Sequence, residues 1–74
     1  MESYDIYKVK LGAKIRKLRK GINMNQMQFG AEIKIDERQL RKIEKGRTNP
    51  RLNTLYRIAD FLDIELKELL SLDE

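Results

Sequence analysis

The 74-residue chain contains neither cysteine nor histidine, and it has a single proline. Without cysteine it can form no disulfide and no thiolate metal site. Without histidine it also lacks the commonest general base and metal ligand. The sequence shows no phosphate-binding glycine loop and no inward-facing pair of carboxylates, which active sites of several enzyme classes require. We therefore expect a protein that is not an enzyme and that holds no metal and no cofactor.

Long apolar runs are missing as well. No stretch approaches the length of a membrane-spanning helix, and the mixed, charged residues 1–10 do not form a signal-peptide pattern. The hydrophobic content of 41% is nonetheless ordinary for a globular protein. A chain of this length suffices for one small domain. The expectation is one domain spanning residues 1–74, soluble and cytoplasmic, with no membrane partner.

The charges are distributed unevenly along the chain. Residues 8–57 contain 15 lysines and arginines against four acids, whereas residues 58–74 contain one lysine against six acids. A basic face favours the phosphate backbone of a nucleic acid. Charge runs on helices can equally be solvated faces with no partner, and composition alone leaves both interpretations open.

Apolar residues recur at spacings of three and four, which predicts an all-α fold of five helices. The expected helices span residues 3–20, 26–33, 37–45, 52–62 and 66–70. The first carries an apolar stripe at Tyr4, Tyr7, Leu11, Ile15 and Leu18, followed by Ile22. The fourth is expected to turn Leu52, Leu55, Ile58, Ala59 and Leu62 inward.

Residues 25–45 predict two short helices joined by a tight turn. Asn25 and Asp36 are good N-caps, and each is followed three residues later by a glutamine, the spacing of a capping box. Helices this short cannot bury themselves and need a supporting scaffold. The arrangement is that of a helix-turn-helix, in which the second helix enters the DNA major groove.

The same segment resembles the lambda-repressor-like (Cro, xenobiotic-response-element type) helix-turn-helix regulators. The resemblance runs without a gap over residues 11–70. The matching positions are Gln26, Phe29, Gly30, Ile33, Lys34, Ile35, Leu40 and Ile43, the Glu-x-Gly-x-x-x-Pro signature at residues 44–50, and Leu55, Ile58, Ala59, Leu62, Ile64 and Leu69. The chain departs from the pattern at Lys34, where glycine is usual, and at Gly30, where alanine is usual. Small members of this family are often phage or mobile-element repressors, or controllers of restriction–modification operons. The small size and long first helix of this chain fit the controllers, though not specifically.

The resemblance implies a structural ion pair between Arg19, late in the first helix, and Glu44, at the end of the recognition helix. The alternative is an Arg19 side chain directed at solvent or phosphate. The resemblance also implies that Gln26 lies at a helix start where family members hold either a phosphate or a base-contacting side chain, and the backbone N–H groups there also favour a phosphate.

Double-stranded DNA is the expected partner, with no small-molecule ligand. The first turns of the recognition helix should meet base edges, because that is how such helices dock. The predicted base-contacting residues are Glu37, Arg38, Arg41 and Lys42. Glu37 either accepts a hydrogen bond from a base, orients a neighbouring arginine, or only favours the helix dipole. The predicted backbone contacts are Asn25, Gln26, Lys45, Arg47, Thr48, Asn49 and Arg51.

Family members usually bind inverted repeats as symmetric dimers, so the resemblance implies a homodimeric transcriptional regulator, with repression the expected outcome. The candidate dimer residues are Phe61, Ile64, Leu66, Leu70 and Leu72, which could instead complete the core of one chain. The alternative function is a protein-interaction module of the same fold, such as an antitoxin or a co-regulator.

Overall fold

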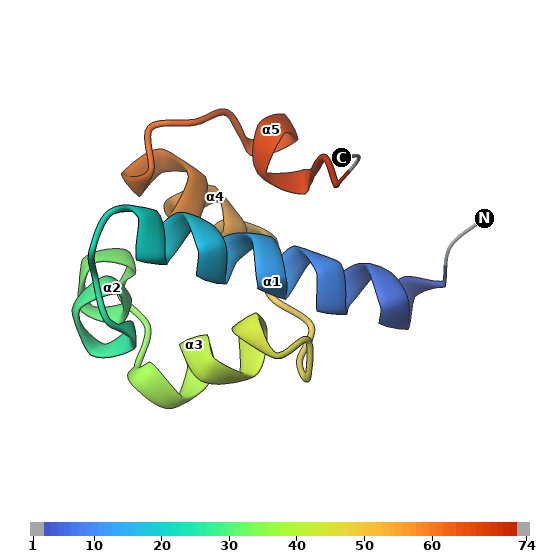
Figure 1. Cartoon of the computed structure of the whole chain (residues 1–74), viewed down its shortest axis with the longest axis horizontal. Helices are drawn as coiled ribbons and strands as arrows, with labels where there is room; N and C mark the ends of the chain where they lie inside the picture. Colours follow the sequence, from blue (N-terminus) through green and yellow to red (C-terminus); the bar gives the residue numbers. More distant parts are fainter. Residues whose placement is uncertain (1–2, 73–74) are drawn as a thin grey trace.

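The longest helix, α1 (Tyr4–Gly21), crosses the whole molecule and contacts two other helices on opposite sides. In the computed structural model, which describes residues 3–72, α3 (Glu37–Glu44) lies below α1 and α5 (Leu66–Leu70) lies above it (Figure 1). The remaining helices, α2 (Gln26–Ile33) and α4 (Leu52–Phe61), pack against each other. The helix α1 is therefore the scaffold on which the helix-turn-helix formed by α2 and α3 is mounted.

All regular structure in residues 3–72 is helical, and the all-α class with five helices is confirmed. The helix bounds lie within one residue of those expected from the sequence. None of these helices is long and apolar enough to cross a membrane.

Local sequence signals explain where α2 and α3 begin. At α2 the capping box is reciprocal: Asn25 Oδ1 accepts a hydrogen bond from the Gln28 backbone N–H at 2.8 Å, and the Asn25 N–H donates to Gln28 Oε1 at 2.9 Å. At α3, Asp36 Oδ1 accepts from the Gln39 N–H at 2.7 Å. These bonds satisfy backbone donors that have no partner within the helix.

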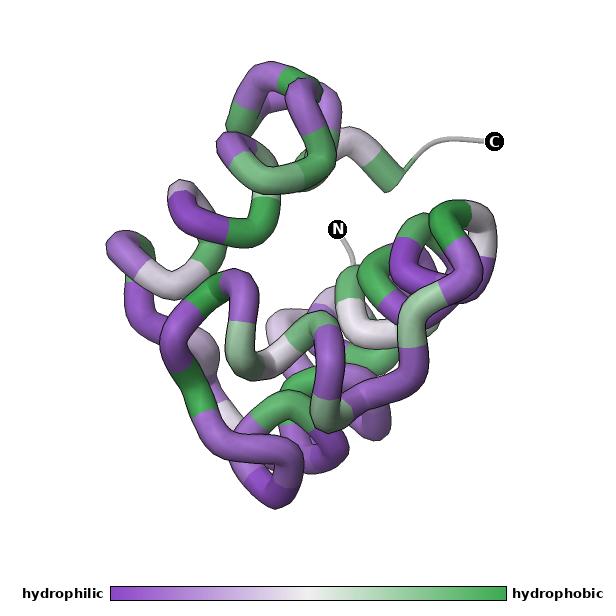
Figure 2. Tube along the Cα trace, turned by 90° about the vertical axis from the view of Figure 1, so that its left-hand side faces the viewer, coloured by the Kyte–Doolittle hydropathy of each residue, from purple (hydrophilic) through white to green (hydrophobic). Residues whose placement is uncertain are grey.

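The core draws apolar side chains from every helix. Figure 2 shows hydrophobic and hydrophilic positions alternating along the chain, as amphipathic helices require. The buried apolar residues are Leu11, Ile15, Phe29, Ile33, Leu40, Ile43, Leu55, Ile58, Ala59 and Leu69. Each helix contributes only one to three of these residues, so no helix is stable without its neighbours.

Three residues expected to face inward are exposed. Tyr4 is 56% exposed because the first turn of α1 projects beyond the helices that cover the rest of it (Figure 1). Its ring is covered on one face by Lys8, whose Nζ lies 5.3 Å from the ring centroid. Ile22, just past the end of α1, and Leu52, the first residue of α4, are 44% and 67% exposed. All three lie at helix ends, where the periodic pattern continues but the packing partner does not.

Contacts from α1 hold the carboxyl end of α5. Tyr7 Oη donates to the Leu70 carbonyl, and Lys14 Nζ donates to the carbonyls of Glu68 and Ser71. The last carbonyls of a helix lack partners within the helix and carry negative partial charge, so a lysine is well suited to this place. This contact ties the C-terminal part of the described chain to the same helix that supports α3.

The turn between α2 and α3 is made without the glycine usual there. Lys34 adopts the left-handed conformation, with φ 63° and ψ 43°. A residue with a Cβ pays about 1–2 kcal/mol in this region. The Ile35 N–H then reaches back to the Gly30 carbonyl at 2.9 Å. A Cβ at Gly30 would lie 2.7 Å from the Ile35 carbonyl oxygen, so the glycine there allows the turn, rather than α3 itself, to approach α2 closely.

Replacing Lys34 with glycine should stabilise the protein. Glycine relieves the strain of the left-handed conformation, but it also raises the conformational entropy of the unfolded chain. The net gain in the free energy of unfolding should be about 0.5–1 kcal/mol, measured with urea. The control is Asn23→Gly, since Asn23 also has a positive φ of 59°. Asparagine tolerates that region better than lysine, so its gain should be smaller. Equal effects, or a loss at Lys34, would contradict the strain assigned to this turn.

Candidate nucleic-acid interface

The helix α3 buries one side and leaves a charged side exposed. Leu40 and Ile43 are buried against the core, whereas Glu37, Arg38 and Lys42 are exposed. Figure 2, in which α3 lies at the bottom, shows that this helix is largely hydrophilic. Asp36 caps the amino end and keeps the first turn regular, so the exposed side chains leave the helix at defined positions.

Glu37 is paired within α3. Its Oε2 lies 3.8 Å from Nη2 of Arg41, one helical turn further on, and both side chains are nearly half exposed. Of the three roles open to Glu37, this geometry favours orientation of a neighbouring arginine. Arg38 and Lys42 have no ion-pair partner among residues 3–72. Their charges are therefore available to a ligand.

A buried ion pair fixes α3 to α1. Arg19 Nε donates to Glu44 Oε2 at 2.7 Å and Arg19 Nη2 donates to Glu44 Oε1 at 3.0 Å, a bidentate pair. Their side chains are only 7% and 1% exposed. The expected pair is present, and Arg19 points neither to solvent nor outward to a phosphate.

Two neighbours complete the pair. Arg19 Nη1 donates to the Met24 carbonyl at 2.7 Å, and Gln26 Nε2 donates to Glu44 Oε1 at 3.1 Å. The ion pair thereby fixes three segments: α1, the loop into α2, and the end of α3. Sequence reasoning did not find the Met24 contact, because a backbone carbonyl leaves no signal in residue type.

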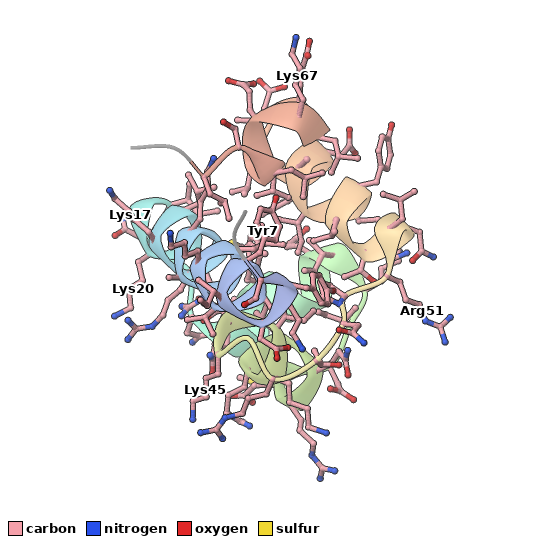
Figure 3. All side chains as sticks on the ribbon, turned by 90° about the vertical axis from the view of Figure 1, so that its right-hand side faces the viewer. Tyr7, Lys17, Lys20, Lys45, Arg51 and Lys67 are labelled. Carbon is pink, nitrogen blue, oxygen red and sulfur yellow. The ribbon has the colours of Figure 1, made fainter. Side chains whose placement is uncertain are left out.

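The expected backbone-contacting residues lie at the start of α2 and in the segment between α3 and α4. Asn25, Lys45, Arg47, Asn49 and Arg51 are exposed, while Gln26 and Thr48 are partly buried. Gln26 is engaged with Glu44, so it is positioned before any ligand arrives. In Figure 3, Lys45 and Arg51 point away from opposite flanks of the molecule.

The candidate dimer residues are only partly exposed for contact with a second chain. Ile64, Leu66, Leu70 and Leu72 are partly buried against the core of their own chain. Phe61 is 36% exposed and packs edge-on against Phe29, with ring centroids 5.7 Å apart. Sequence reasoning did not include Tyr56, which is 60% exposed and lies four residues after the exposed Leu52 on α4. Their spacing of four was the available signal, since it places both on one helix face.

A capped, amphipathic second helix with free cations, held rigidly on its scaffold, defines a helix-turn-helix of the DNA-binding class. The chain belongs to the lambda-repressor-like family, since residues 15–69 match the sequence profile described as Helix-turn-helix. It is a DNA-binding transcriptional regulator.

Individual proteins similar to this chain carry names of the same kind. Control protein C.MunI from Mycoplasma sp is 38% identical over 65 residues, covering 86% of this chain and 88% of that protein. The cryptic phage CTXphi transcriptional repressor RstR from Vibrio cholerae is 36% identical over 61 residues, or 82% of this chain but only 54% of the repressor. Among solved structures, the restriction-modification controller protein C.AhdI from Aeromonas hydrophila superposes with a TM-score of 0.85 at 28% identity, covering 92% and 99% of the two chains.

Proposed function

We propose that this protein represses transcription as a homodimer on an inverted-repeat operator, with α3 of each copy in the DNA major groove. The observation that carries the proposal is the outward, unpaired charge of Arg38 and Lys42 on a helix fixed from behind by the buried Arg19–Glu44 pair. Similarity to a phage repressor and to restriction–modification controllers supports a role at a promoter.

Base reading falls to the exposed side of α3. An arginine can donate two parallel hydrogen bonds to O6 and N7 of guanine, and Arg38 lies in the first turn with no competing carboxylate. Arg41 is held by Glu37, which limits its freedom before binding and points it along the same helix. Lys42, one turn after Arg38, completes the base-contacting set. The pairing of Glu37 with Arg41 offsets the repulsion that a lone carboxylate would feel beside phosphates.

Phosphate contacts set the position of α3 in the groove. Phosphate donors are expected in the segment that leads from α3 to α4, which holds Lys45, Arg47, Thr48, Asn49 and Arg51. At the other end of the motif, Asn25 uses its side-chain oxygen to cap α2, which leaves its amide nitrogen as a donor for phosphate. The start of α2, with Gln26, adds backbone N–H groups that favour an anion.

Dimerisation through the α4–α5 surface would double the small area over which one chain contacts DNA. A single helix-turn-helix contacts one half-site, and two-fold symmetry places the second recognition helix about one DNA turn away. Phe61 is the exposed apolar anchor, and the segment after it adds partly exposed apolar side chains at Ile64, Leu66, Leu70 and Leu72. The acidic side chains of the same region keep this surface away from DNA.

The test compares Arg38→Ala with Arg47→Ala on a duplex that the wild-type protein selects. Arg38→Ala should cost about 1–3 kcal/mol for each half-site and relax discrimination at one base position in each. Arg47→Ala should weaken all duplexes alike, because a phosphate contact carries no sequence information. Affinities for the selected duplex and its single-base variants give both quantities. The same uniform loss from both substitutions would remove the base-reading role of Arg38.

A further inference from the structure

A groove between α1 and the end of α3 is strongly basic. Its lining residues are Val9, Ala13, Arg16, Lys17, Lys20, Glu44, Lys45 and Arg47. We refer to its cations, Arg16, Lys17, Lys20, Lys45 and Arg47, as the α1 basic surface. All are exposed, and none pairs with a carboxylate among residues 3–72. The function proposed above uses only Lys45 and Arg47 from this surface.

The one carboxylate in the groove does not reduce this charge. Both oxygens of Glu44 accept hydrogen bonds from Arg19, and the Glu44 side chain is 1% exposed. Its charge is balanced by Arg19, which is not part of the α1 basic surface. The surface therefore presents five cations with no accessible counter-charge, an arrangement that attracts a polyanion and is costly to keep without one.

The position of Arg16 and Lys20 follows from the packing of Gly12. A Cβ at Gly12 would lie 2.3 Å from the Ile43 carbonyl oxygen, so this side of α1 touches α3. Arg16 and Lys20 follow Gly12 at spacings of four and eight residues, which places them on the adjacent strip of the same helix. Figure 3 shows Lys17, Lys20 and Lys45 along one flank, with Arg51 on the other and Lys67 at the far end.

We propose that Arg16 and Lys20 bind phosphates of the duplex that α3 reads, so that α1 adds a sequence-independent contact beside the occupied groove. The duplex is the polyanion that fits, because the α1 basic surface continues directly into Lys45 and Arg47 at the end of the recognition helix. The inference rests on the proposed function, and it extends the footprint of the protein to a helix outside the helix-turn-helix.

The double substitution Arg16→Gln/Lys20→Gln tests this contact. On the selected operator, which two chains occupy, it should reduce the steepness of log affinity against log salt by about 4, since each chain loses two phosphate contacts. The ratio of wild-type to variant affinity should then shrink about a hundredfold between 50 and 200 mM salt. The double variant should lose affinity for an unrelated duplex by the same factor. The variant Arg16→Lys/Lys20→Arg keeps both positive charges, so it should retain most of the wild-type affinity.

Lys67→Glu is the matched control, because it changes the net charge by the same two units at an exposed position far from the groove. It should leave the salt slope nearly unchanged. Thermal unfolding verifies that each variant is folded. If the double variant is not folded, Lys20→Gln alone should still reduce the steepness of the salt dependence by about 2, one phosphate contact from each chain.

Replacement of single operator phosphates by neutral methylphosphonates locates the contact. At some operator positions the methylphosphonate should weaken binding of the wild type but not of the double variant, because the side chains that contact those phosphates have already been removed. If variant and wild type show the same slope and the same sensitive phosphates, Arg16 and Lys20 do not bind DNA, while the proposed function stands. If the wild type binds no duplex specifically, both proposals fail.

Discussion

Replacement of Glu44 by alanine is expected to destabilise the protein by about 3–5 kcal/mol, because it leaves the charge of Arg19 buried without a partner. Arg19 cannot move to solvent cheaply, since Nη1 is also held by the Met24 carbonyl. Gln26 loses its acceptor at the same time. A small protein has only about 5–15 kcal/mol of stability, so urea unfolding should show a large drop in the midpoint.

Glu37→Ala is the matched control for this prediction. It removes a glutamate from the same helix, but its ion pair with Arg41 spans 3.8 Å and is nearly half exposed. Exposed pairs of this kind contribute about 0.3–0.5 kcal/mol. If Glu44→Ala lowered the free energy of unfolding as little as Glu37→Ala, the buried pair would not hold α3 to α1.

The double variant Arg19→Met/Glu44→Leu separates the pair from its parts. Removing both charges avoids an uncompensated buried ion, so the double variant should lose less stability than the two single substitutions added together. Additive losses would show that the two side chains act independently, in conflict with their bidentate geometry.

The substitution Gly12→Ala should have the second largest effect. The new Cβ would lie 2.3 Å from the Ile43 carbonyl oxygen and 2.6 Å from that of Glu44, both backbone atoms that cannot rotate away. Relief requires α1 and α3 to separate. We expect a net loss of about 2 kcal/mol or more, even though alanine gains about 1 kcal/mol of helix propensity over glycine. Because α3 must shift, operator affinity should fall as well.

Gly21→Ala provides the control in the same helix. A Cβ at Gly21 would meet nothing within 4 Å, so only the propensity gain remains and stability should be unchanged or slightly higher. A Gly12→Ala variant as stable as Gly21→Ala would rule out the tight approach of α1 to α3.

The periodic pattern predicted the helices well, because residues three and four apart share a helix face whatever that face contacts. The caps at Asn25 and Asp36 were equally readable, since a cap bonds a backbone N–H only two or three residues away. The pattern failed at Tyr4, Ile22 and Leu52. Whether a helix end is covered depends on distant parts of the chain, which local spacing does not encode.

Some contacts of the site could be predicted from the sequence and others could not. The Arg19–Glu44 pair came from family resemblance; no helical period links residues 25 apart. The contacts of Tyr7 and Lys14 with α5 were not predicted, because they join side chains to backbone carbonyls more than 50 residues away. The residues assigned to bases, to phosphates and to the dimer surface remain predictions, since each depends on a partner molecule.

Selection from a random duplex library tests sequence-specific recognition most directly, when the affinity of the selected duplex is then followed against salt and the number of bound chains is measured. We expect an enriched inverted repeat, bound by two chains with a steep salt dependence. Recovery of no motif, with only weak salt-sensitive binding, would contradict sequence-specific recognition and favour a protein partner for this fold.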